Sequence, residues 1–131
     1  MVSTRALWAG RILSSLAILF LIFDGMIKLP PLEIVTATMK ELGYPTTESF
    51  ARFLGIVTLA CTALYAWPRT ALLGAVLLTS LFGGAIATHL RIGSPLFSHT
   101  LFGIYLDIMV WGGLWLRDER VRRVMPFMRH D

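Results

Sequence analysis

The sequence predicts an all-α integral membrane protein: an up-down bundle of four helices with a short amphipathic helix between the first two. Hydrophobic residues make up 56% of the 131 residues and charged residues only 15%, and the mean hydropathy is +0.69. These values are too apolar for an ordinary soluble domain. Residues 70–88 carry no charge, a run long enough at ~1.5 Å per residue to cross a ~30 Å hydrocarbon core. We therefore expect residues 1–131 to form one transmembrane domain.

The first helix is expected over about residues 7–29, because the apolar run at 12–23 is too short to span alone. Pro30 and Pro31 end it. Asp24 and Lys28 lie near its end in the acid-then-base i,i+4 order, which predicts an ion pair.

An amphipathic helix is expected next, from Leu32 to Leu42. Its apolar residues recur at helical spacing, while charged residues occupy the other positions. It is too short and too polar to span a bilayer, so we expect it to lie on the membrane or to cap the bundle. Gly43 is a suitable stop for this helix, and Thr46 or Thr47 can cap the next one.

The remaining spans are expected at about 49–67, 70–89 and 99–116. Pro68 ends the second span, and the short connection makes the second and third antiparallel neighbours. Two rows of small residues in the third span predict close contact with other helices; they are Ser80, Gly84 and Thr88, and Gly83 with Ala87.

The distribution of lysine and arginine predicts the orientation. Eight of the twelve lie in the two tails and the connection at Pro68: Arg5, Arg11, Arg69, Arg117, Arg120, Arg122, Arg123 and Arg129. This excess predicts that both termini, including a basic tail at 117–131, are cytoplasmic, with the helices in the inner (plasma) membrane of the cell. The cations form no stripe interleaved with aromatic residues, so the lipid bilayer is the expected partner and nucleic acid is not.

Ionisable residues gather in the outer half of the predicted bundle, which indicates a polar cavity opening outward. The candidates for catalysis are Asp24, His89 and Asp107, and those for substrate binding are Lys28, Arg52, Arg91 and His99. Asp107 lies within a span, where a charge costs several kcal/mol unless it is paired, hydrated or protonated. Structural alternatives stay open: Asp24 with Lys28 as an interface pair, Arg52 as an interface anchor and His99 as a helix cap.

These residue types suit acid–base chemistry. A histidine or carboxylic acid can transfer protons, and a neighbouring cation can stabilise an enolate or quinol anion. No H-x-x-x-H or E-x-x-H spacing is present, so no metal site is predicted. Cys61 is the sole cysteine and is expected to pack as a small apolar residue.

The chain resembles the DoxX-like family of small bacterial four-helix membrane proteins over roughly residues 8–117. The resemblance lies in short motifs in a characteristic order: Gly10-Arg11-Ile12-Leu13, Asp24-Gly25 with Lys28, Leu42-Gly43-Tyr44-Pro45, Gly55-Ile56, Pro68-Arg69-Thr70-Ala71 with Gly74-Ala75, and Gly83-Gly84-Ala85 before His89 and Arg91. The family name comes from a subunit of a thiosulfate:quinone oxidoreductase. The resemblance therefore implies a link to membrane quinones or to thiol redox balance, with a quinone as the implied cofactor.

Three functional hypotheses follow. The first is binding of a lipophilic small molecule, quinone-like or terpenoid-like, in the outer cavity, with redox-linked or acid–base chemistry there. The second is a non-catalytic accessory subunit that anchors a membrane oxidoreductase partner through the basic tail. The third is a proton-coupled transporter, which four short helices without an internal repeat would support only as a homo-oligomer. The sequence leaves open whether the protein is an enzyme.

Overall fold

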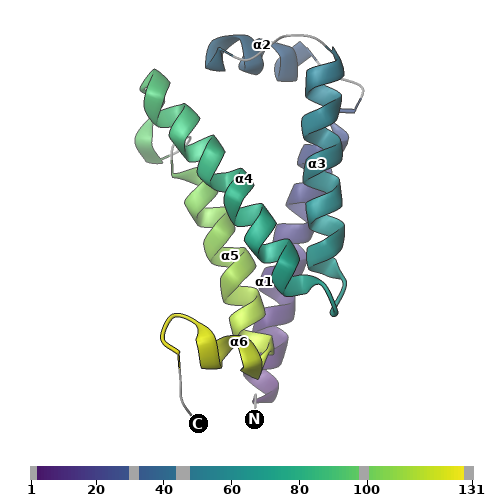
Figure 1. Cartoon of the computed structure of the whole chain (residues 1–131), viewed down its shortest axis with the longest axis vertical. Helices are drawn as coiled ribbons and strands as arrows, with labels where there is room; N and C mark the ends of the chain where they lie inside the picture. Colours follow the sequence, from purple (N-terminus) through teal and green to yellow (C-terminus); the bar gives the residue numbers. More distant parts are fainter. Residues whose placement is uncertain (1–2, 30–32, 44–47, 98–100, 129–131) are drawn as a thin grey trace.

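The computed structural model describes residues 3–29, 33–43, 48–97 and 101–128 and is all-α in these ranges. Four long helices carry the fold, which confirms the predicted class (Figure 1). The elements are α1 (Thr4–Met26), α2 (Glu33–Leu42), α3 (Glu48–Ala66), α4 (Ala71–Ile92), α5 (Phe102–Arg117) and α6 (Glu119–Val124).

The four long helices pack in a ring. α1 lies against α3 and α5, and α4 lies against the same two helices. Successive long helices run in opposite directions, with both ends of the chain at one end of the bundle and α2 across the other (Figure 1). Toward the α2 end, α4 and α5 lean away from α1 and α3. The separation between these two pairs of helices is therefore widest near α2.

Three helices, α1, α3 and α4, are long and apolar enough to cross a membrane. α5 has 16 residues and begins at Phe102, later than the predicted start at 99; residues 98–100 and the candidate His99 lie outside the described ranges. The proposed caps Thr46 and Thr47, together with Pro30, Pro31 and Arg129, also fall outside them. Span length and composition support a multi-pass membrane protein.

The first span begins and ends three residues earlier than predicted. Its start is fixed by Ser3, whose Oγ accepts a hydrogen bond from the backbone N–H of Ala6 at 3.1 Å. This satisfies one of the donors that a helix start leaves unpaired. After Met26 the chain continues as a turn, in which the N–H of Lys28 donates to the carbonyl of Gly25 at 3.2 Å. Lys28 therefore lies just beyond the helix.

Both ends of the third span also differ from the prediction. α4 runs to Ile92 rather than 89, and Gly93 ends it with a left-handed φ of 71°. His89 and Arg91 are consequently part of its last turn. The predicted stop at Gly43 after α2 is present as well, with φ 81°.

The basic tail contains the short helix α6, which the sequence analysis did not predict. Asp118 caps it by accepting from the backbone N–H of Arg120 at 2.9 Å. Val121 is 4% exposed and belongs to the main hydrophobic core. α6 is thus part of the folded bundle.

Glycines bring two helix pairs close together. A Cβ on Gly10 would lie 2.6 Å from the carbonyl oxygen of Gly113, so α1 and α5 approach backbone to backbone. A Cβ on Gly55 would lie 2.8 Å from the carbonyl oxygen of Gly25, so α1 and α3 also approach backbone to backbone. Small residues permit such approach in lipid. These contacts pack α3 and α5 closely against α1.

The prediction of close packing at Gly83 and Gly84 is wrong. A Cβ built on either glycine would meet no atom within 4 Å. Both are exposed. These two glycines therefore leave open space beside α4 and make no close contact with another helix.

Candidate functional site

A cavity of about 570 Å³ lies beneath α2, with walls from α1, α3, α4 and α5. Its walls are mainly apolar and include Phe20, Leu54, Phe82 and Leu106. α2 covers it with Thr38, Met39 and Leu42. Most described polar groups that line it come from the helix ends nearest α2, so the cavity combines an apolar body with a polar end.

Asp24 and Lys28 form the predicted ion pair at the polar end of the cavity. The Lys28 ammonium donates to Asp24 Oδ2 at 2.8 Å, and both residues line the cavity. Their side chains are 22% and 33% exposed for Lys28 and Asp24, respectively. The pair is thus within reach of a bound molecule, while each charge has a partner.

His89 lines the same cavity from α4. Its Nδ1 lies 2.9 Å from the hydroxyl oxygen of Ser94, just beyond the helix. This contact fixes the direction of the imidazole. A titratable ring therefore lies in the wall of the cavity that also holds the ion pair.

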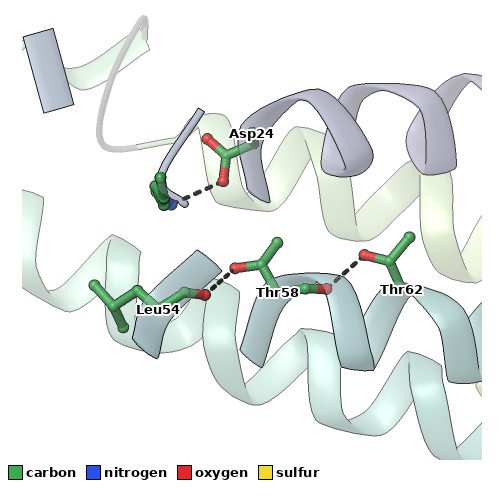
Figure 2. Close-up of polar contacts among 5 residues, drawn as sticks. Asp24, Leu54, Thr58 and Thr62 are labelled. Atoms are coloured by element: carbon green, nitrogen blue, oxygen red, sulfur yellow. Dashed lines mark hydrogen bonds and ion pairs between the residues drawn. The ribbon is translucent and has the colours of Figure 1, made fainter. Parts of the chain in front are cut away.

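Thr58 is a polar wall residue that the sequence analysis missed. Its hydroxyl donates to the carbonyl of Leu54 at 2.8 Å, and Thr62 donates to the carbonyl of Thr58 at 2.7 Å (Figure 2). The proton of Thr58 is thus used within α3, and its side chain, which is 2% exposed, is part of the cavity wall. The four-residue spacing of the two threonines was visible in the sequence, but not the face they occupy.

The two arginines predicted to bind substrate contact the backbone beside α2 instead. Arg52 Nε donates to the carbonyl of Leu29, before α2, at 2.9 Å. Arg91 Nη2 donates to the carbonyl of Leu42, the last residue of α2. Neither arginine lines the cavity. Arg91 holds the C-terminal end of α2 to α4, and Arg52 holds the turn after α1 to α3.

Asp107 does not join Asp24 and His89, which corrects the expectation of one shared cavity. It lines a separate groove of about 270 Å³ between α4 and α5. Thr79 Oγ1 donates to Asp107 Oδ1 at 2.8 Å, and Trp111 Nε1 donates to Thr79 Oγ1 at 2.7 Å. Trp111 therefore lines the groove and donates to the hydrogen-bond network that holds Asp107.

Phe82 and Ile86 line both spaces, and two neighbouring glycines line one space each. Gly84 lines the cavity beneath α2 and Gly83 lines the groove. Among the described residues, no group of three His, Cys, Asp or Glu side chains is placed to hold a metal ion.

Comparison with known families decides the identity of this bundle. The model of the DoxX-like family matches residues 12–113. The chain belongs to the DoxX-like family. Comparisons with curated proteins and with solved structures found no match.

The family match covers the DoxX-like bundle and leaves out its tail. It runs from the first turns of α1 almost to the end of α5, so it includes the cavity, its cover and the groove. α6 lies beyond it. The predicted resemblance is thereby confirmed, and the protein is a DoxX-like membrane protein.

Proposed function

We propose that this DoxX-like protein binds a lipophilic small molecule, quinone-like or terpenoid-like, in the cavity beneath α2. The observation that carries the proposal is the cavity itself, about 570 Å³ with mainly apolar walls and a few polar groups at one end. Sites for small molecules typically have ~300–1,000 Å³ and this mixture of surfaces. The open sides of a bundle in lipid also give an apolar molecule a direct route of entry.

The proposed orientation follows from the lining residues. The apolar body of the ligand packs among side chains such as Phe20, Phe82 and Leu106. Its polar head lies toward Lys28 and His89, where an oxygen atom can accept a hydrogen bond. This places the reactive end of a quinone-like or enolisable molecule beside titratable groups.

Acid–base or redox-linked chemistry at this end would use three side chains. Lys28 stabilises negative charge that develops on a ligand oxygen, and Asp24 holds the ammonium in place. His89 gives or takes the proton, with its ring oriented by Ser94. Asp107 has no part in this proposal because it lies in the other groove.

Mass spectrometry of organic extracts from the purified protein tests the proposal with a matched pair of variants. Gly84→Leu projects a side chain into the cavity, whereas Gly83→Leu makes the same change in the neighbouring groove. Both sites have open space for the new Cβ. We expect a quinone or another lipophile to be retained by the wild type and by Gly83→Leu, and to be lost from Gly84→Leu.

The outcomes separate the proposed ligands. A quinone lost only from Gly84→Leu assigns the cavity to respiratory redox chemistry, and an Asp24→Asn variant then tests the ion pair. A terpenoid lost in the same way favours an isomerase or a carrier. Equal retention by all three proteins, or bulk lipid alone in the wild type, contradicts the proposal.

A second candidate function is that of an accessory subunit that docks a membrane oxidoreductase through the tail. The observation that favours it is the exposure of Phe127 and Met128, which are 82% and 73% exposed beyond α6. Deleting the whole tail would remove Val121 from the core, so the suitable variant is Phe127→Ser with Met128→Ser. Native electrophoresis of solubilised membranes should show a large complex only for the wild type if docking is the function. An unchanged complex would contradict this role.

A further inference from the structure

Asp107 lies in a groove on the outer side of α4 and α5, about 270 Å³ in volume. Ile86, Ile104 and Ile108 supply apolar walls, and Trp111 supplies an aromatic one. The lining of this groove includes neither the ion pair nor the histidine of the cavity beneath α2. The groove is a second place where the bundle offers a polar group to an apolar molecule.

A chain of hydrogen bonds fixes the carboxyl group of Asp107. Trp111 Nε1 donates to Thr79 Oγ1 at 2.7 Å, and Thr79 donates to Asp107 Oδ1 at 2.8 Å. No buried, unpartnered side-chain oxygen occurs in the described part of the chain. Because Oδ2 of Asp107 has no hydrogen bond from these residues, it is reachable from the groove. The hydrogen bond to Oδ1 orients the carboxyl group, and Oδ2 is accessible from the groove.

Asp107 also has no counter-ion within 4.0 Å among the described residues. Among the residues that the structure describes, the ion pairs within 4.0 Å involve other acids: Asp24, Asp118 and Glu119. An unpaired carboxylate among apolar side chains is costly, and pairing with a cation lowers that cost. A bound cation would supply the charge that balances Asp107.

We propose that the groove binds a lipophilic organic cation. The cationic centre lies against Asp107 Oδ2, where the low dielectric strengthens the attraction between opposite charges. The face of Trp111 adds a cation–π contact, and the isoleucine side chains receive the apolar substituents of the ligand. A neutral or anionic lipophile of the same shape gains neither electrostatic contact. This binding is separate from that proposed for the cavity beneath α2.

Isothermal titration calorimetry on the purified full chain in detergent tests the proposal. Tetraphenylphosphonium is the probe, and tetraphenylborate is a control of the same shape and opposite charge. We expect saturable binding of the cation alone. Asp107→Asn keeps an oxygen for Thr79 but removes the charge, and should weaken binding at least about tenfold.

The glycine variants test the location independently of any effect on Asp107. Gly83→Leu fills the groove and should abolish cation binding, whereas Gly84→Leu points into the other cavity and should leave it unchanged. Thermal unfolding of each variant establishes that it is folded. If Asp107→Asn does not fold, the two glycine variants decide the question.

Several results would overturn the proposal. They are equal affinity for the borate, unchanged binding by folded Asp107→Asn, or loss of binding in Gly84→Leu with retention in Gly83→Leu. The last result would move the cation into the cavity beneath α2. Because the extracted lipophile and the cation are measured separately, failure of the cavity proposal leaves the outcome for the groove unaffected.

Discussion

Gly113 and Gly112 are neighbours on α5 with opposite surroundings. A Cβ on Gly113 would collide with Ser14 Oγ and would lie 2.9 Å from the backbone nitrogen of Ser14 and 3.0 Å from the carbonyl oxygen of Gly10. A Cβ on Gly112 would meet only Leu13 Cδ1, at 3.9 Å. The first position is closed by backbone atoms, and the second is open.

This contrast predicts that Gly113→Ala destabilises the bundle by about 1–3 kcal/mol, because α1 and α5 must separate. Gly112→Ala should be neutral or stabilising by up to about 1 kcal/mol, since alanine favours a helix over glycine. Thermal unfolding in one detergent measures both. Equal stability of the two variants would contradict the close approach of α1 and α5.

Polar contacts between α1, α3 and α5 in the core were not predicted. The Ser14 hydroxyl lies 2.8 Å from the Tyr65 hydroxyl oxygen, Tyr65 donates to the carbonyl of Val110, and Arg117 Nε donates to Ser14 Oγ at 3.2 Å. The Asp24–Lys28 pair, by contrast, follows from a four-residue spacing within one stretch of chain. Residue-level prediction succeeded where both partners were close in sequence and failed where they came from different helices.

At the level of elements, α6 depends on its cap. Hydrogen bonding from the Arg120 side chain holds the pKa of Asp118 below its ordinary value. A carboxyl whose pKa is lower in the folded state stabilises that state above its unfolded pKa of ~3.9. This contribution is lost as the pH falls from that value through the folded pKa.

We therefore expect α6 to fray below about pH 4, while the wild type keeps it at neutral pH. Asp118→Ala should fray at neutral pH as well, at a cost of about 1 kcal/mol typical of a lost cap. Hydrogen exchange of residues 119–124 measures the change. Arg123→Ala, which removes only an exposed pair with Glu119 at 3.8 Å, is the matched control. Protection that is the same in Asp118→Ala would contradict the role of the cap.

Arg91 anchors the last residue of α2, and Arg52 anchors Leu29, in the turn that precedes α2 in the chain. The other contacts of α2 are few, and Met39 is its described buried side chain. Removing both guanidinium groups in Arg52→Gln with Arg91→Gln should raise hydrogen exchange in residues 33–42 several-fold, because the backbone carbonyls beside α2 lose their donors. Lys40→Gln, an exposed change on α2 itself, should have little effect. If exchange is unchanged in the double variant, the arginines do not secure the cover.

For the whole molecule, the distribution of charge predicts that both termini are cytoplasmic, and the structure places them at the end opposite α2 (Figure 1). Cys61 is buried, at 8% exposed, so introduced cysteines can report the orientation. A membrane-impermeant maleimide should label Glu41→Cys on α2 in intact cells and Arg123→Cys on α6 only after permeabilisation. The reverse pattern would invert the proposed topology.

The sequence by itself determined the class of fold, the order of the elements and the ends of the long helices to within three residues. These properties depend on local chemistry: long apolar runs, prolines and glycines that stop helices, and charges four residues apart. The tertiary structure alone decided which residues meet. The tilt and rotation of each helix place Asp24 and His89 around one cavity, direct Asp107 into another groove and turn Arg52 and Arg91 toward the backbone beside α2. These angles result from packing between helices distant in the sequence, which no local pattern specifies.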